Sequence, residues 1–123
     1  MVVALVLAVF CGTAAAQQEV LFWHAMGGES QKTLKTMVDR FESTHTSIHI
    51  ELVGMGNYDA LSQKLMGAVA AKNPPVIAQM YENWTTQLHA GGELVYLDSF
   101  VHGPGGLSAE DLADVYPALL ESN

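Results

Sequence analysis

The sequence predicts an α/β fold built on a parallel sheet. Three short apolar runs with the length of buried strands alternate with two amphipathic helical patterns, and turn residues separate them. A strand–helix–strand–helix–strand order makes the strands parallel, because each right-handed helical crossover returns the chain to the same end of the sheet. The length of 123 residues fits one domain.

The N-terminus carries the pattern of an export signal. An unbroken apolar run, Val2–Phe10, is followed by small residues in an Ala-x-Ala pattern that ends at Ala16. This order is typical of a secretory signal peptide, although no basic residue precedes the run. The polar residues that follow make it too short to span a membrane, which takes about 20 apolar residues. We therefore expect residues 1–16 to be a signal peptide and residues 17–123 to form the exported domain.

The first strand is predicted at Glu19–His24, the apolar and aromatic run EVLFWH. A helix follows, because apolar residues recur at positions i, i+3, i+4 and i+7 opposite a charged face. Its stripe consists of Leu34, Met37, Val38 and Phe41. The second strand is predicted at Ile48–Val53, where apolar and polar residues alternate.

A glycine-rich turn, Gly54–Asn57, leads into the second helix. The stripe of this helix consists of Tyr58, Leu61, Leu65 and Val69. The run Asn73–Pro75 ends the helix, since proline cannot continue one, and the third strand is predicted at Val76–Tyr81.

The pattern is weaker beyond the third strand. A short helix is predicted over Asn83–Ala90, an extended segment at Val95–Leu97 and a loop at His102–Gly106. Ser108 has the position of an N-cap before two acidic residues, which predicts a last helix. The stripe of this helix consists of Leu112, Val115 and Leu119.

Charge and cysteine content exclude several function classes. The net charge is −8, from 13 acidic against 5 basic residues, so no basic surface is available for nucleic acid. The single cysteine, Cys11, allows neither a disulfide framework nor a thiolate zinc site. His45 and His49 straddle a loop and a strand, which is poor spacing for a metal, and we predict no metal or cofactor.

Ligands of open parallel sheets bind beyond the carboxyl ends of the strands. In this sequence each of those ends carries an aromatic residue beside a hydrogen-bonding group, which suits a hydroxylated solute. The candidate ligand-binding residues are Trp23, His24, Tyr58 and Glu82.

Each candidate also has a structural interpretation. Trp23 and His24 suit a buried strand, Tyr58 suits the helix stripe, and Glu82 suits a solvated loop. The glycines before Tyr58 lack the third glycine of a dinucleotide-binding loop, which leaves a tight turn. No nucleophile–base pair or paired carboxylate is evident, so the residues favour recognition over catalysis.

The order of these motifs resembles a known family. The segments VLFWHAMGGE, IELVGMGNYDALSQKL and PPVIAQMYENWTTQL follow an export signal in the order seen in extracytoplasmic solute-binding proteins of ABC importers. Within that family the chain is most similar to the glycerol-3-phosphate-binding branch, through FWH, GNY and YE. The resemblance covers about residues 19–97.

The resemblance implies the N-terminal lobe of a two-lobe periplasmic-binding-protein-like fold, here incomplete, because members have a second lobe that closes on the ligand. It assigns ligand contacts to Tyr58 and Glu82, and it places Trp23 and His24 near the cleft. It also implies a periplasmic location and an ABC permease as partner. Because a carboxylate repels phosphate, Glu82 is expected to bind the glycerol hydroxyls, while the phosphate needs a cation from elsewhere.

Two alternatives stay open. The first is the same class of binding protein for a neutral sugar or oligosaccharide; an arginine and serines facing Glu82 from the second lobe would favour phosphate instead. A small secreted α/β domain of unrelated function is the more distant alternative. On its own, this part of a lobe is expected to bind weakly or not at all, because a pocket normally buries 70–90% of its ligand.

Overall fold

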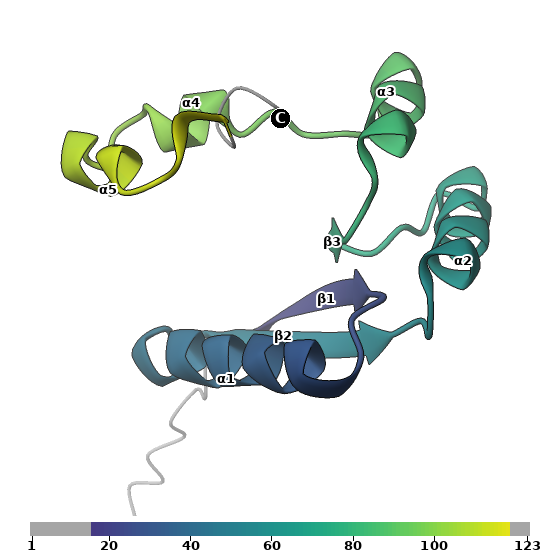
Figure 1. Cartoon of the computed structure of the whole chain (residues 1–123), viewed down its shortest axis with the longest axis horizontal. Coiled ribbons are helices and arrows are strands. Elements are labelled where there is room, and N and C mark those ends of the chain that lie inside the picture. The colour runs from purple at the N-terminus through teal and green to yellow at the C-terminus, as the bar shows by residue number, and fades with distance from the viewer. Residues whose placement is uncertain (1–15, 119–123) are drawn as a thin grey trace, which may run out of the picture.

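The computed structural model describes residues 16–118 and gives the parallel α/β architecture that the sequence predicts (Figure 1). The predicted signal peptide lies almost wholly outside the described residues. None of the described helices has the length and hydropathy needed to span a bilayer. The elements in chain order are β1 (Gln18–His24), α1 (Gly28–Thr44), β2 (Ile48–Gly54), α2 (Tyr58–Ala70), β3 (Ile77–Ala78), α3 (Glu82–Ala90), α4 (Asp98–Val101) and α5 (Ala109–Ala113).

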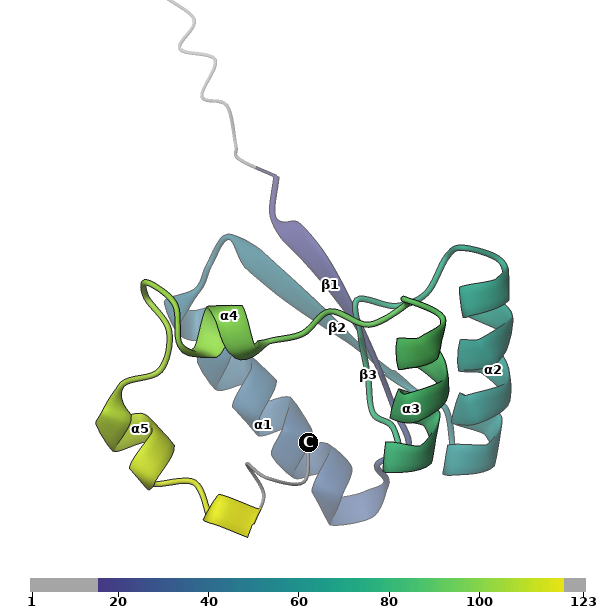
Figure 2. The same cartoon turned by 90° about the horizontal axis from the view of Figure 1, so that it is seen from above.

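The sheet has the strand order β2–β1–β3, and both strand pairs are parallel. β1 lies in the centre and pairs with β2 along its whole length, from Gln18 opposite Ile48 to His24 opposite Gly54. Because β1 connects to β2 and β2 to β3 in opposite directions, right-handed crossovers put α1 and α2 on opposite sides of the sheet. Figures 1 and 2 show α1 along one side and α2 and α3 next to each other beyond the other.

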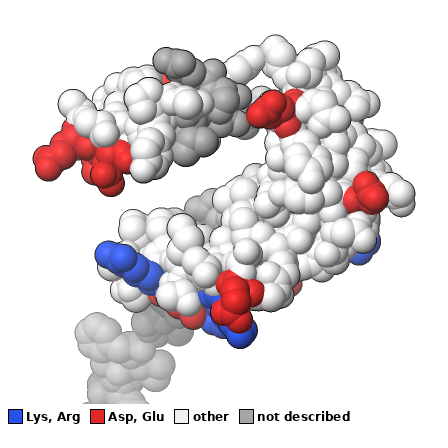
Figure 3. Space-filling model, viewed as in Figure 1, with Lys and Arg blue, Asp and Glu red and all other residues white. Residues whose placement is uncertain are grey.

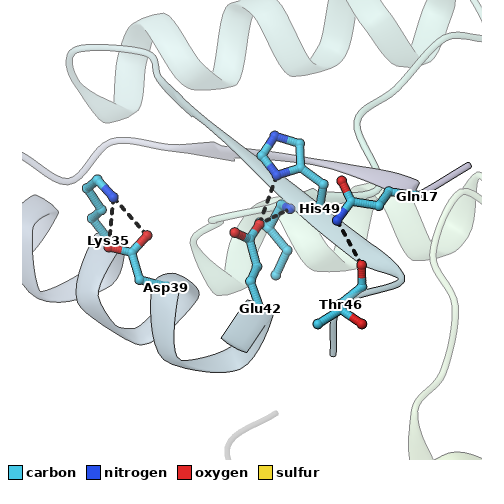
Figure 4. A network of polar contacts seen from close by, with 7 residues as sticks. Gln17, Lys35, Asp39, Glu42, Thr46 and His49 are labelled. Atoms are coloured by element: carbon cyan, nitrogen blue, oxygen red, sulfur yellow. Dashed lines mark hydrogen bonds and ion pairs between the residues drawn. The ribbon is translucent and has the colours of Figure 1, made fainter. Parts of the chain in front are cut away.

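A glutamate ties the end of α1 to β2. One carboxylate oxygen of Glu42 accepts hydrogen bonds from the backbone N–H of Ile50 at 2.6 Å and pairs with Nδ1 of His49 at 3.0 Å (Figure 4). In the same region the side-chain amide of Gln17 donates to the carbonyl oxygen of Thr46 at 2.7 Å. These contacts fix the loop between α1 and β2 against the start of β1.

The hydrophobic core is small and lies mainly under α2. Leu61 is fully buried and Leu65 is 3% exposed. α1 contributes only Val38 to the buried set, since Met37 is 64% exposed and Phe41 is also exposed. The predicted α1 stripe is therefore buried only in part, at Val38, in the described part of the chain.

The third strand is shorter than predicted. Only Ile77 and Ala78 pair with β1, opposite Phe22 and Trp23, so the predicted extent of Val76–Tyr81 is wrong. The prolines directly before it have no N–H for a sheet ladder, and β3 lies at the edge of the described sheet. The chain therefore leaves the sheet early, and Gln79 is free to use its side chain.

The segment after α3 also differs from expectation. Leu97 has helical dihedral angles instead of extended ones and precedes the short helix α4, which was not predicted. The predicted cap at Ser108 is confirmed, since its hydroxyl oxygen accepts from the N–H of Asp111 and the Asp111 carboxylate accepts from the N–H of Ser108. The side-chain and backbone hydrogen bonds from Ser108 lower the pKa of Asp111. α5 ends at Ala113, so it is shorter than the predicted helix, whose apolar stripe ran to Leu119. Leu119 itself lies outside the described residues.

Candidate functional site

The candidate site lies where the chain leaves the carboxyl ends of the strands and enters α2 and α3. Gly56 has a φ of +87°, in the left-handed region that favours glycine, and so turns the chain after β2. Asn57 then caps α2, with its side-chain oxygen accepting from the N–H of Ala60 at 2.9 Å. This cap fixes Tyr58 as the first residue of α2.

Tyr58 is the centre of an aromatic cluster with two residues of the α3 region. Its ring stacks on Tyr81, with centroids 4.0 Å apart and planes at 22°. Trp84 packs edge-on against both rings, with centroid distances of 6.0 Å to Tyr58 and 5.5 Å to Tyr81. We call Tyr58, Tyr81 and Trp84 the aromatic shelf. It joins the N-terminal ends of α2 and α3, which lie next to each other in Figure 2.

Gln79 connects the aromatic shelf to the sheet. Its backbone N–H donates to the carbonyl oxygen of Trp23 at 2.9 Å. Its side-chain oxygen accepts from the N–H of Ala25 at 3.0 Å, and its side-chain nitrogen donates to the hydroxyl oxygen of Tyr58 at 2.6 Å. The residue therefore holds the end of β1, the end of β3 and the start of α2 together.

Glu82 is the first residue of α3, between two members of the aromatic shelf in sequence. Its side chain is exposed, and at the first turn of a helix a carboxylate is favoured by the helix dipole. Tyr81 next to it is 52% exposed. The aromatic shelf is thus an open surface rather than an enclosed pocket.

The structure separates Trp23 from His24. Adjacent strand residues point to opposite faces of a sheet, so the two side chains cannot meet on one side. Trp23 is half-buried in β1, and its carbonyl oxygen accepts from the backbone N–H of Gln79, which bonds Tyr58 of the aromatic shelf. His24 is fully buried, packs edge-on against Phe22 and lies close to Gly54. The structure therefore does not bring His24 to the surface that carries Tyr58.

Three residues of this region were not among the predicted ligand contacts: Gln79, Tyr81 and Trp84. Tyr81 and Trp84 are three residues apart at the start of a helix, a spacing that places side chains on one face. That spacing is a signal in the sequence. Gln79 has no such signal, because its two side-chain partners are 54 and 21 residues away along the chain.

The part of the chain that carries Tyr81, Glu82 and Trp84 is acidic in sequence. Each of the five basic residues precedes residue 73, whereas residues 73–118 contain six acidic residues and no lysine or arginine. Figure 3 shows acidic side chains on both the upper and the lower part of the molecule, whereas the basic ones are visible only on the lower part. In the described part of the chain, this region offers hydroxyl and aromatic groups and a carboxylate, but no cation for a phosphate.

No family model matches the chain. It is similar to curated sn-glycerol-3-phosphate-binding periplasmic proteins UgpB: 38% identical to that of Pectobacterium atrosepticum over 77 residues, which is 63% of this chain and 17% of that protein. The identity is 36% over 88 residues with the Yersinia enterocolitica protein, covering 72% of this chain and 20% of the relative. With the Salmonella typhimurium protein it is 35% over 81 residues, covering 66% of this chain and 18% of the relative.

These relatives confirm the resemblance to the glycerol-3-phosphate-binding branch of the solute-binding proteins. The chain spans at most about a fifth of the length of the relatives that it matches. The parallel sheet with its flanking helices is consistent with part of a periplasmic-binding-protein-like lobe.

Proposed function

We propose that this chain is part of an exported solute-binding protein that binds glycerol-3-phosphate or a glycerophosphodiester and delivers it to the membrane permease of an ABC importer. The proposal extends to the domain organisation, with a signal peptide at residues 1–16 and part of the N-terminal lobe at residues 17–123. It also extends to a periplasmic location and to a protein that binds its ligand without transforming it.

The observation that carries the proposal is the aromatic shelf beside Glu82, beyond the carboxyl ends of parallel strands. This is the position at which open α/β sheets bind ligands. Aromatic faces cover the C–H surface of a polyol, and a carboxylate accepts hydrogen bonds from its hydroxyls. The similarity to glycerol-3-phosphate-binding proteins over about two thirds of the chain supports the same ligand class.

We assign the glycerol end of the ligand to Tyr58 and Glu82. Glu82 accepts from hydroxyls, and Tyr58 packs against or hydrogen-bonds the same end. The phosphate is assigned to a cation and hydroxyls outside residues 73–118, because that range carries no basic residue and a carboxylate would repel the phosphate. Trp23 and His24 stay predictions of lower rank as ligand contacts.

The test is a titration of the 123-residue chain with sn-glycerol-3-phosphate, followed by amide NMR shifts up to about 50 mM ligand, so that a millimolar Kd is detected. We expect shifts at Tyr58, Glu82 and the Trp84 indole N–H. Glu82→Ala and Tyr58→Phe should each weaken binding about tenfold or more, because each removes a hydrogen bond. Glu93→Ala is the matched control, since it removes a carboxylate outside the aromatic shelf.

Shifts elsewhere in the wild-type chain that avoid these residues would contradict the assigned site, and unchanged binding by Glu82→Ala would contradict the role of Glu82. Maltose and glycerophosphocholine serve as competing ligands. The absence of a cation near the aromatic shelf also favours a neutral sugar as the second candidate. Stronger shifts with maltose than with sn-glycerol-3-phosphate would select that alternative.

A further inference from the structure

Gln79 makes two side-chain hydrogen bonds that together determine its orientation. One is with the backbone N–H of Ala25 at 3.0 Å, and the other is with the hydroxyl group of Tyr58 at 2.6 Å. A backbone N–H can only donate, so the group facing Ala25 must be the amide oxygen of Gln79. The amide nitrogen therefore faces Tyr58, and the orientation of the amide follows from its partners.

The direction of the second hydrogen bond follows in turn. An amide NH₂ group donates and does not accept, so the hydroxyl oxygen of Tyr58 is the acceptor in this contact. A phenol has one proton, and this contact does not use it. The proton of Tyr58 is thus available to another acceptor, and the stacked ring of Tyr81 at 4.0 Å limits where the Tyr58 ring can move.

We propose that Gln79 is a positioning residue that makes Tyr58 a hydrogen-bond donor toward the solute. The inference rests on the proposed function for its ligand, but the orientation of Gln79 rests only on the contacts described above. The inference specifies which groups the solute must carry: an oxygen that accepts from Tyr58 and a hydroxyl that donates to ionised Glu82. A solute with neighbouring hydroxyl groups satisfies both, since each hydroxyl donates and accepts.

Gln79→Glu tests the direction of the hydrogen bond with little change in shape. A carboxylate accepts from both the Ala25 N–H and the Tyr58 hydroxyl, so both contacts survive while the Tyr58 hydroxyl becomes the donor within the protein. The tyrosine Fermi doublet in the Raman spectrum distinguishes an accepting phenol from a donating one. The spectrum of Tyr58 is obtained by subtracting the spectrum of the Tyr58→Phe chain.

We expect the doublet of Tyr58 to report a phenol that accepts as well as donates in the wild-type chain, and one that only donates in Gln79→Glu. A phenol that only donates in the wild-type chain overturns the proposal, and so does an unchanged doublet in Gln79→Glu. If the Gln79→Glu chain does not fold, the wild-type spectrum by itself still tests the direction of the hydrogen bond. None of these readouts needs a ligand, so they stand whether or not the chain binds glycerol-3-phosphate.

Binding of sn-glycerol-3-phosphate tests the link to the solute. Gln79→Glu should raise the Kd about tenfold or more, because Tyr58 no longer has a proton to donate. Asn57→Asp is the charge-matched control: it adds a carboxylate next to Tyr58 in sequence and keeps the acceptor that caps α2. In a Tyr58→Phe chain, Gln79→Glu should have no effect beyond that of the added charge.

Two results separate the inference from the proposed function. A wild-type chain whose shifts with glycerol-3-phosphate avoid Tyr58 and Glu82 contradicts the proposed site, while the Raman signature still decides how Gln79 orients Tyr58. The second result starts from a wild-type chain that binds glycerol-3-phosphate. If Gln79→Glu then lowers the affinity equally with and without the Tyr58 hydroxyl, the function stays in place and the role of Gln79 is overturned.

Discussion

Two polar side chains near the end of β1 have opposite environments. Gln79 uses both ends of its amide in hydrogen bonds, so its burial carries little cost. His24 is fully buried, and neither ring nitrogen has a hydrogen-bond partner among the described residues. An unpartnered polar group in the interior lowers stability, because it loses its hydrogen bonds to water and gains none in return.

This contrast predicts that His24→Leu stabilises the fold. The change removes two unpartnered polar atoms and keeps an apolar side chain against Phe22, so the free energy of unfolding should rise by about 1–3 kcal/mol. His102→Leu, at an exposed histidine, should change it by less than about 0.5 kcal/mol. Urea unfolding measures both, and a loss of stability in His24→Leu would show that the imidazole is hydrogen-bonded in solution.

At the scale of elements, α2 supports both the core and the site. Its N-terminal residue belongs to the aromatic shelf, while Leu61 and Leu65, one and two turns further on, are buried. Lys72, just after α2, bonds the carboxylate of Glu93 at 2.8 Å, which raises the pKa of Lys72. Both groups of that pair lie at the surface, so the buried leucines carry the packing of this helix.

Leu61→Ala should therefore destabilise the chain strongly. Truncating a fully buried leucine loses its apolar contacts and leaves a cavity, so we expect a loss of about 2–5 kcal/mol in the free energy of unfolding. Leu97→Ala is the matched control, since this leucine is 64% exposed and should change stability by less than about 0.5 kcal/mol. Similar effects of the two substitutions in urea unfolding would show that α2 does not pack as described.

The described chain consists of a small packed body, which contains the sheet and α1–α3, and a C-terminal segment that stands away from it (Figure 1). We call this segment, residues 95–118, the arm. Figures 1 and 2 show α4 and α5 on the side of the molecule where α1 lies, and Figure 3 shows open space between them and the rest of the chain. Large apolar side chains on the arm are exposed: Val95, Tyr96, Leu97, Phe100, Leu107 and Tyr116. Many exposed apolar side chains in one segment lower solubility, and a segment with few packed contacts opens easily.

Limited proteolysis with chymotrypsin tests this division. We expect the first cuts at Tyr96 and Phe100 in the arm, while Phe22 and Trp23 in β1 resist cleavage because they are paired on both sides in the sheet. Mass spectrometry of the early fragments identifies the sites. Cleavage in β1 at the same rate as in the arm would show that the sheet does not hold together as a unit.

The parts of the fold that follow from local pattern were predictable. The two long helices and the first two strands lie where periodicity and alternation indicated, and the Ser108 cap forms as its neighbours suggested. β3 was overestimated because its apolar run cannot reveal how many of its residues find a partner strand. α4 was missed because a single helical turn leaves no periodic signal.

The candidate site was predictable only in part. Tyr58 and Glu82 were identified from their positions after strands and from the resemblance, and the structure puts Tyr58 against the neighbours of Glu82. Trp23 and His24 looked equivalent because they are adjacent in sequence. Strand alternation places them on opposite faces, and only the packing against Phe22 and Gly54 shows that His24 is on the buried one.

The sequence by itself determined the α/β class, the order of the elements and the acidic balance of this chain, because each depends on composition or on periods of two and 3.6 residues. Tertiary structure decided the aromatic shelf, the burial of His24 and the link from Gln79 to Tyr58. These features join residues that are tens of positions apart, and a distance between distant residues is set by how the strands and helices pack, which no local pattern encodes.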